Sequence, residues 1–189
     1  MYQRFRSYLY LKSRCRCYLY LTFITALFTC GSVDADILSE QQIKASYIYN
    51  FAKFAEWPVA ALPEGSDIHL CLLGGGPVSE AVTAFQGHKI GHQHLQVIEL
   101  DSNVPFTTCH LLFISNSHAV DLRVVLNAIA TLPILTISDI DDFARKGGGI
   151  GLLLRENKVR FDINLETVNA VGVHLPGQLL NIANHVYGN

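Results

Sequence analysis

The stretch IHLCLLGGGPVSEAVTAF, residues 68–85, decides the fold class. Its first six residues, Ile68–Leu73, are apolar on both alternating faces except at His69, which is typical of a strand that is covered on both sides. A glycine triplet ends the strand, and Pro77 is well placed to begin a short helix over Val78–Phe85. A buried strand that leads through a tight turn into a helix is a building unit of α/β folds.

Further strands and helices alternate after this unit. Leu95–Leu100 has the pattern of a partly exposed strand, and His110–Ser115 and Ile134–Ile137 have that of buried strands. Val120–Ala130 places its apolar residues on one face of a helix. This alternation predicts a single α/β domain with a central, mostly parallel sheet and helices on both faces.

The last third changes character. Gly149–Leu154 and Lys158–Ile163 are predicted strands on either side of Arg155-Glu156-Asn157, which indicates a β-hairpin. This C-terminal hairpin would add an antiparallel edge to the sheet. Helices are expected over Leu165–Val171 and Gln178–Val186.

An amphipathic helix is expected before the first strand, in the run IKASYIYNFAKFAEWP, residues 43–58. Ser39 and Gln42 form a capping box at its start, and Pro58 prevents the helix from continuing. The predicted apolar face consists of Ile43, Tyr47, Ile48, Asn50, Phe51, Phe54 and Ala55. Asn50 is the one polar member of this face, where its amide must either brace a neighbouring backbone segment or belong to a binding cleft.

Residues 1–35 have the composition of a signal peptide. A basic leader with five arginines and lysines and no acidic residue precedes Tyr18–Phe28, an apolar run that is short for a membrane span. Small residues before the junction predict cleavage between Ala35 and Asp36, which leaves residues 36–189 as the mature, exported domain. Two alternatives are an uncleaved membrane anchor and a lipoprotein acylated at Cys30.

The composition excludes some partners. The chain has 189 residues, of which half are apolar and 16% are charged, with a formal net charge of −2. Such a balance offers no basic surface for nucleic acid, so no nucleic acid partner is expected.

Cleavage would leave two cysteines, Cys71 and Cys109, in the mature domain. An even pair in an exported chain predicts a disulfide, and two free buried thiols are the alternative. Closing a loop of this length stabilises a fold by about 4 kcal/mol in the chain-entropy model.

Three groups of residues are candidates for a binding site. Gly74, Gly75 and Gly76 stand between a strand and a helix, where α/β folds bind phosphates, but they lack the spacing of a nucleotide-binding loop and also fit a plain turn. Together with Asn50 and Trp57 they are the predicted residues of a ligand or partner cleft.

His88, His92 and His94 form the most metal-like cluster. No acid or thiolate stands nearby in the sequence, so this is a weak candidate, and neither a metal nor another cofactor is expected. Ser115, Ser117 and His118 do not make a triad by adjacency alone, and no nucleophile elbow is present. The sequence therefore does not predict an enzyme.

A series of motifs runs in one order through nearly the whole mature chain. They are Lys44-Ala45-x-Tyr47-Ile48-Tyr49-Asn50-Phe51-x-Lys53-Phe54-x-Glu56-Trp57-Pro58, Cys71-x-x-Gly74, Cys109-His110-x-Leu112-Phe113-Ile114-Ser115, Leu135-Thr136-x-Ser138-Asp139, Phe143-Ala144, Gly147-Gly148, Val159-Arg160-Phe161-x-Ile163-Asn164 and Gln178-Leu179-Leu180-x-x-Ala183. In this order they resemble the motifs of the YfiR family of small exported proteins.

The resemblance implies a periplasmic regulator. Family members bind the periplasmic sensor domain of an inner-membrane diguanylate cyclase and hold it inactive, and an outer-membrane lipoprotein can sequester them. The output is cyclic di-GMP, and hence exopolysaccharide and biofilm. The resemblance also places the family's central disulfide on Cys71 and Cys109.

The sequence thus predicts a negative regulator that binds a membrane diguanylate cyclase, with a homodimer as an open question. The alternative is a periplasmic small-molecule sensor or solute-binding module, with its cleft near the glycines at 74–76.

Overall fold

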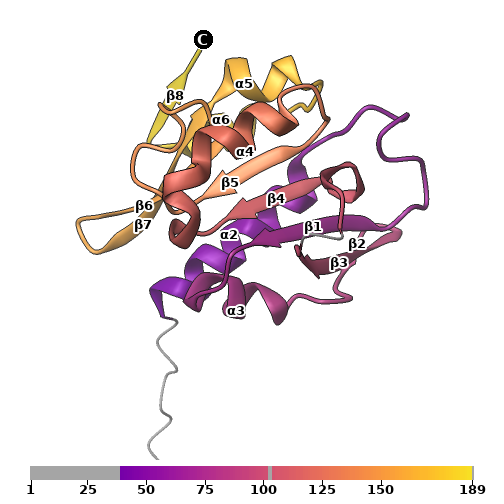
Figure 1. Ribbon diagram of the computed structural model, residues 1–189, viewed down its shortest axis with the longest axis horizontal. Helices are drawn as coiled ribbons and strands as arrows, with labels where there is room; N and C mark the ends of the chain where they lie inside the picture. Colours follow the sequence, from indigo (N-terminus) through magenta and orange to yellow (C-terminus); the bar gives the residue numbers. More distant parts are fainter. Residues whose placement is uncertain (1–38, 102–103, 189) are drawn as a thin grey trace, which may run out of the picture. The chain divides into compact units, whose positions relative to one another are not determined.

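The computed structural model describes residues 39–101 and 104–188 (Figure 1). The chain divides into two units, Met1–Ile37 and Leu38–Asn189, and the described residues all belong to the second. The expected signal peptide over residues 1–35, its cleavage between Ala35 and Asp36 and the alternative acylation of Cys30 lie outside the described residues. Within the described ranges, no helix is long and apolar enough to cross a membrane.

Helices and strands alternate as the sequence predicts. In chain order they are α2 (Glu40–Phe54), β1 (Ile68–Leu73), α3 (Pro77–Thr83), β2 (Lys89–Ile90), β3 (Gln93–Glu99), the 3-10 helix η2 (Phe106–Thr108), β4 (Leu111–Ile114), the 3-10 helix η3 (Asn116–Asp121), α4 (Leu122–Ile129), β5 (Leu135–Ser138), β6 (Ile150–Arg155), β7 (Lys158–Asn164), α5 (Leu165–Ala170), α6 (Gly177–Ile182) and β8 (His185–Tyr187).

One sheet of eight described strands runs in the order β2-β3-β1-β4-β5-β6-β7-β8. The five central strands from β3 to β6 are parallel, β2 and β7 are antiparallel to their neighbours, and β8 is parallel to β7. The predicted fold class is therefore confirmed. The order β3-β1-β4-β5 places the topological switch point, where consecutive connections leave on opposite faces, between β1 and β4.

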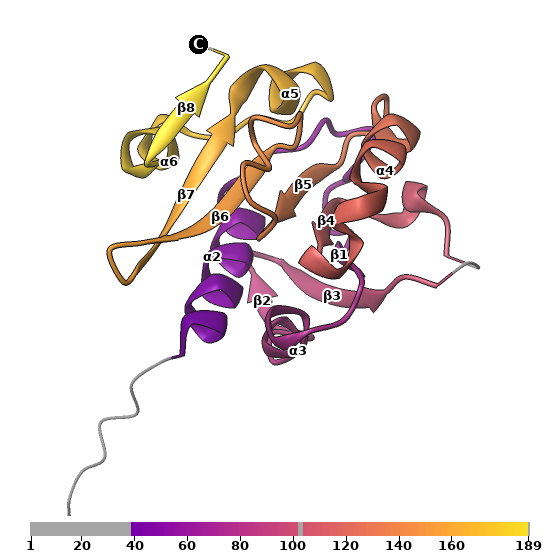
Figure 2. The ribbon, with the colours of Figure 1, turned by 60° about the vertical axis from the view of Figure 1, so that its left-hand side comes forward.

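The central strands are covered on both faces because their side chains alternate between two cores. Leu70 and Leu72 point into one core with the buried faces of α2 and α3, whereas Cys71 between them points into the other core with α4. Figure 2 shows α2 and α4 on opposite sides of the sheet. This double burial explains why these strands are apolar on both parities.

Helix α2 begins with the predicted capping box, in which Ser39 accepts from the Gln42 amide and the Gln42 side chain accepts from the Ser39 amide. It ends at Phe54, four residues before Pro58, because Ala55 already has an extended backbone. The predicted buried face is wrong in part. Phe54 is 46% exposed and Asn50 is half-buried, whereas Lys44, Ala45, Ile48, Phe51 and Ala52 are buried.

The buried face of α2 includes a cation, Lys44. Lys44 has its Nζ 2.7 Å from Glu40 Oε1 and 3.8 Å from Asp139 Oδ2. Asp139 directly follows β5 and accepts from the Asn116 amide after β4. The pair therefore ties α2 to the carboxyl ends of two central strands. A buried lysine requires such partners, so its burial depends on tertiary contacts.

The hairpin of β6 and β7 forms as predicted. Its two-residue turn, Glu156-Asn157, has φ of 50° and 59°, the left-handed geometry that matches strand twist. The chain then adds one more strand outside the hairpin, because β8 pairs with β7. The helix predicted over Gln178–Val186 is thus wrong at its end: α6 stops at Ile182, and His185–Tyr187 is a strand.

The connection from β5 to β6, residues 139–149, contains turns instead of a helix. Asp142 has a φ of 56°, and three glycines stand at the end of the connection. A Cβ on Gly148 would lie 2.1 Å from the Phe143 ring, and one on Gly149 would lie 2.9 Å from the Thr136 carbonyl. The segment therefore packs tightly on the sheet. The space that a crossover helix would fill stays open beside it.

Replacing Gly148 by alanine should destabilise the protein by about 1–3 kcal/mol, because the buried Phe143 ring must move to admit the methyl group. Thermal unfolding followed by circular dichroism measures this loss. Gly75→Ala is the matched control: it has nothing within 4 Å of a built Cβ and should unfold at or slightly above the wild-type midpoint. Equal midpoints for the two variants would contradict the tight packing of this segment.

Candidate functional site

The glycine triplet lies at the carboxyl end of β1, beside the switch point. It lines a cavity of about 440 Å³ together with Leu72, Ser79, Glu80, Thr83, Glu99 and Leu100. The Ser79 hydroxyl donates to the Gly74 carbonyl at 2.8 Å, and the Ser115 hydroxyl donates to the Gly75 carbonyl at 2.8 Å. These bonds close the turn with the chain's own side chains.

The chemistry of this cavity disfavours an anion. Its two ionisable residues, Glu80 and Glu99, are both acidic, and α3 behind it has only seven residues. A phosphate would meet two carboxylates and no cation. The cavity therefore does not support the nucleotide-like interpretation of the glycines.

Asn50 and Trp57 are not brought into this cavity. Trp57 lies at the opposite end of the strands, where its indole N–H donates to the His110 carbonyl at 3.2 Å. Asn50 lies half-buried on α2, and its side chain makes no hydrogen bond with any residue that the structure describes. The predicted five-residue cleft is thus divided among three places.

The three histidines of the metal-like cluster have separate surroundings. The His88 ring packs against Tyr49 and Phe85, with centroid distances of 5.8 Å and 5.3 Å. His94 Nδ1 lies 3.6 Å from Asp67 Oδ1. Over residues 39–101 and 104–188, no group of three or more histidine, cysteine or acidic side chains is placed to hold a metal ion.

The residues after β4 do not assemble a nucleophile. The Ser117 hydroxyl donates to the Ser115 oxygen at 3.2 Å, and Ser115 in turn donates to a carbonyl. The His118 ring lies against Gly74, where a Cβ would be 2.4 Å away. These contacts fix the turn between two strands and its glycine, which has a φ of 89°.

The predicted disulfide is present. Cys71 on β1 and Cys109 just before β4 are bonded, with their Cα atoms 5.7 Å apart. Both are buried. The bond joins two neighbouring central strands, so it belongs to the core of the sheet.

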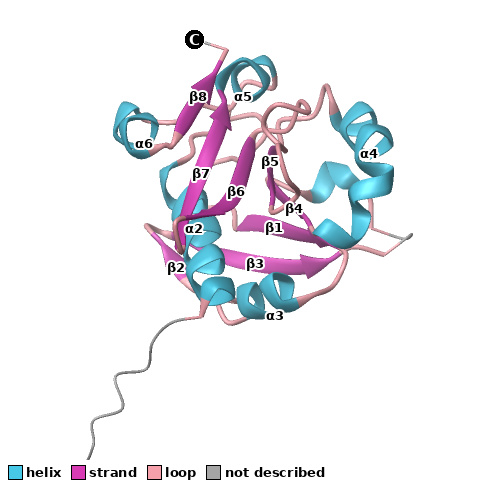
Figure 3. Cartoon of the chain, turned by 90° about the vertical axis from the view of Figure 1, so that its left-hand side faces the viewer, coloured by secondary structure: helices cyan, strands magenta, loops and turns pink. Residues whose placement is uncertain are grey.

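The larger concave surface lies elsewhere, between α4 and α5. We call it the α4–α5 groove. Its volume is about 740 Å³, and it is lined by Ala119, Leu122, Arg123, Leu126, Asn127, Ile129, Ala130, Ile134, Thr136, Lys146, Gly147, Glu166, Thr167, Ala170 and Val171. The missing crossover helix between β5 and β6 explains why this face of the sheet is left open. Figure 3 shows α4 and α5 as separate helices.

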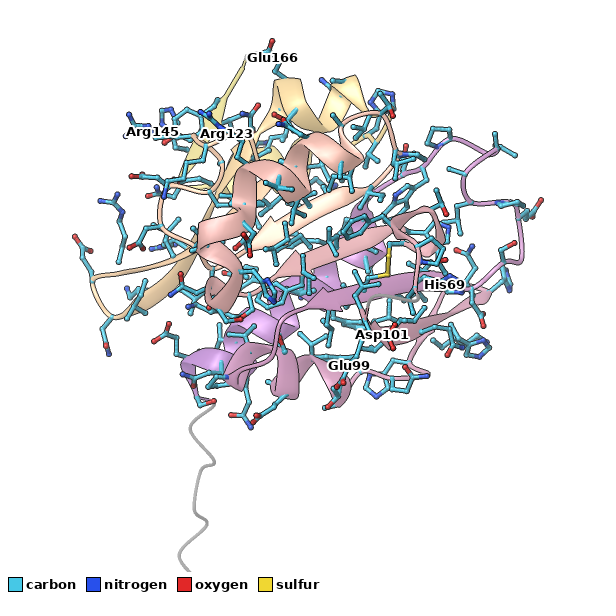
Figure 4. The ribbon with its side chains drawn as sticks, viewed as in Figure 1. His69, Glu99, Asp101, Arg123, Arg145 and Glu166 are labelled. Carbon is cyan, nitrogen blue, oxygen red and sulfur yellow. A yellow bond between two sulfur atoms is a disulfide. The ribbon has the colours of Figure 1, made fainter. Side chains whose placement is uncertain are left out.

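The groove combines an apolar floor with charges of both signs at its rim. Leu122, Ile129 and Ile134 are buried in the core below it. Arg123 on α4 and Glu166 on α5 are exposed and form no ion pair with another described residue (Figure 4). Lys146 is held by its own loop, where its Nζ donates to the Asp141 carbonyl at 2.8 Å.

Such a surface can bind a chain segment. Among the lining residues, Thr136 carries the one buried hydroxyl. The oxygen of this hydroxyl accepts a hydrogen bond from the Gly149 amide at 2.8 Å. An apolar floor with a charged rim is the anatomy of a protein-binding surface. The sequence analysis missed this groove, and its only signal was the glycine-rich stretch where a crossover helix would be expected.

The comparison with protein families agrees with the resemblance that the motifs carry. The family model described as YfiR/HmsC-like matches residues 41–184. None of the curated proteins matches the chain. A crystal structure titled as a conserved domain protein from Vibrio cholerae O1 biovar El Tor str. N16961 is similar at 10% identity and a TM-score of 0.49.

That alignment covers 76% of this chain and 60% of the other chain, so this chain spans less than two thirds of that protein. The family model covers most of the sequence and all central strands. The chain belongs to the YfiR/HmsC-like family.

Proposed function

We propose that this protein inhibits an inner-membrane diguanylate cyclase by binding the periplasmic sensor domain of that enzyme. The family match over residues 41–184 carries this proposal, because the family consists of periplasmic regulators of diguanylate cyclase signalling and not of enzymes. Inhibition would lower cyclic di-GMP, and with it exopolysaccharide and biofilm. Export by the signal peptide at residues 1–35 would place the mature domain, residues 36–189, in the same compartment as the sensor domain.

The α4–α5 groove is the surface that we assign to the cyclase. It is the larger of the two cavities described above, and Arg123 and Glu166 at its rim form no ion pair within residues 39–101 and 104–188. Those charges can orient an amphipathic segment whose apolar face covers Leu126 and Ala170. The groove therefore fits a helix or strand from the sensor domain.

The mechanism is a shift between two arrangements of the cyclase. The regulator must bind the inactive arrangement more tightly than the active one, and about 5.5 kcal/mol of differential affinity turns a 1:99 ratio into 99:1. This mechanism needs no chemical step on the regulator. The enzyme would be released if an outer-membrane lipoprotein competed for the regulator. If the regulator formed a homodimer, the dimer could present two such surfaces.

A small-molecule sensor is the second candidate, and the cavity beside the glycine triplet supports it. Its two carboxylates, Glu80 and Glu99, select a small cationic compound over an anionic one. A thermal-shift screen with amines and anionic metabolites tests this candidate. Stabilisation by amines that is lost in Glu99→Gln would support it, and the absence of any shift would remove it.

A binding measurement tests the first proposal. The mature domain is immobilised and titrated with the purified periplasmic segment of a diguanylate cyclase encoded beside it. Saturable binding that is lost at high salt and in groove variants is expected, because the rim is charged. Binding that groove variants leave unchanged would place the contact elsewhere on the protein, and no binding at all would remove the proposal.

A further inference from the structure

The walls of the α4–α5 groove are two helix faces. The lining residues of α4 and its end form two rows at spacings of four and three, which are Leu122-Leu126-Ile129 and Arg123-Asn127-Ala130. The lining residues of α5 and its end form two rows at a spacing of four, which are Glu166-Ala170 and Thr167-Val171. Residues three or four apart lie on one side of a helix, so each wall presents one continuous face to the groove.

The floor of the groove is a face of the sheet and not one of its edges. Thr136 of β5 belongs to this floor, and β5 lies between β4 and β6. The strand pairs with β4 along its whole length and with β6 at its carboxyl end. A strand laid on such a floor would leave its backbone N–H and C=O groups unpaired, whereas a helix pairs these groups within itself. The groove therefore suits a helix better than a strand.

The length of α4 sets the length of the contact. It has eight residues, which span about 12 Å at about 1.5 Å per residue, so a helix beside it is in contact over about two turns. The groove is lined by small residues at Ala130, Gly147 and Ala170. Its occupant must therefore bring the large apolar side chains, at the spacing of three and four that fills a groove between helices.

The charges at the rim are divided between the two walls. Arg123 lies on α4, and a Cβ on Gly147 would lie 4.0 Å from the Leu126 side chain, which places the loop at Lys146 and Gly147 against α4. Lys146 donates to a neutral carbonyl. Glu166 lies on α5. The α4 side of the groove is therefore basic and the α5 side is acidic.

We propose that the groove binds one amphipathic α-helix of the partner, which takes the place of the crossover helix that is absent between β5 and β6. Acidic side chains of this helix face Arg123, and basic ones face Glu166. The proposal rests on the proposed function, since the sensor domain of the cyclase is the partner that supplies the helix. Arg123 and Glu166 are then the residues that determine which helix is accepted and in which direction it lies.

A second copy of this chain does not offer such a helix. Of the helices over residues 39–101 and 104–188, only α2 and α4 have eight or more residues. α4 is itself a wall of the groove, and the apolar face of α2, with Ile48 and Phe51, is already buried in the core. The helix must therefore come from another protein.

NMR of the complex tests the secondary structure of the bound segment. The periplasmic segment of the neighbouring cyclase is labelled with ²H, ¹³C and ¹⁵N and bound to the unlabelled mature protein. Cross-saturation identifies its contacting residues, and Cα shifts give their conformation. We expect contacts three and four residues apart within one helix. Contacts two apart in a strand, or contacts confined to loops, would overturn the helix but leave the cyclase as the partner, whereas no binding would remove the proposed function itself.

Charge reversal at the rim tests the direction of the helix. Arg123→Glu and Glu166→Lys should each raise the Kd roughly two- to 25-fold at physiological salt, because each loses an exposed ion pair and gains a repulsion of similar size. Arg155→Glu is the matched control. It lies exposed at the tip of the β6–β7 hairpin and outside the groove lining, so its Kd should equal that of the wild type. Unchanged Kd values for both groove variants would overturn the proposal.

Exchange of charges identifies the pairs. An acidic residue of the cyclase segment that receives cross-saturation is replaced by lysine, which should weaken binding to the wild type and restore binding to Arg123→Glu. Losses that simply add would contradict the pairing. Sedimentation of the mature protein alone is the last check: a dimer that Ala170→Trp dissociates would assign the groove to a second copy and overturn the proposal.

Discussion

Ala170→Trp should weaken cyclase binding by at least about 30-fold while leaving the fold intact. Ala170 is exposed on α5 and lines the α4–α5 groove, so an indole there would fill the space that a partner segment needs. Filling the centre of an interface is expected to cost at least about 2 kcal/mol, which is roughly a 30-fold rise in Kd. The Kd for the cyclase's periplasmic segment, measured by calorimetry, checks this.

Ala128→Trp is the matched control. Ala128 is exposed on α4 but lies outside the groove lining, so the same substitution there should bind with the wild-type Kd. Thermal unfolding of both variants verifies that neither has lost its fold. If Ala170→Trp bound normally, or if Ala128→Trp were equally defective, the groove would not be the contact surface.

Removing the disulfide is the second large change. Cys71→Ser opens a loop of 38 residues, and the chain-entropy model gives a loss of about 4 kcal/mol. The new hydroxyl is placed among apolar neighbours in the core, which adds to the loss. For a domain of this size the unfolding midpoint should fall by about 8–16 °C. Less folded regulator would then raise cyclic di-GMP in cells.

Two comparisons separate the loop effect from the buried hydroxyl. Cys71→Ala removes the bond without adding a polar group, so it should recover part of the loss. Wild-type protein in reductant should approach the midpoint of Cys71→Ala. A wild-type midpoint for Cys71→Ser would show that the bond contributes nothing to stability.

The order of strands and helices was predictable because burial on both faces leaves a local mark. The run Leu111–Ile114, for example, is apolar at every position because its side chains alternate between the two cores. Turn chemistry was also local: the hairpin turn at Glu156-Asn157 and the capping box at Ser39 depend on residues within four positions of each other. These features were therefore predicted correctly from the sequence.

The features that were mispredicted depend on distant partners. The buried face of α2 includes Lys44, whose ammonium group lies near Asp139, a residue almost a hundred positions later. The strand β8 exists because the outer edge of β7 is available to it, so a helical pattern there was misleading. Periodicity alone carries no information on either contact.

The candidate site was harder to predict than the fold. The α4–α5 groove arises from a helix that is missing over residues 139–149, and its walls come from α4 and α5, which are far apart in the chain. The role of Trp57 likewise became clear only when its indole was placed on the His110 carbonyl. The glycine triplet, which was prominent in the sequence, proved to be a turn closed by Ser79 and Ser115.

One measurement tests the central claim most directly. The diguanylate cyclase is reconstituted in membrane vesicles with its periplasmic domain accessible, and cyclic di-GMP formation is measured as the mature protein is added. A saturable fall in activity is predicted for the wild type, with no fall at the same concentrations for Ala170→Trp. Unchanged cyclase activity at saturating wild-type protein would contradict the account.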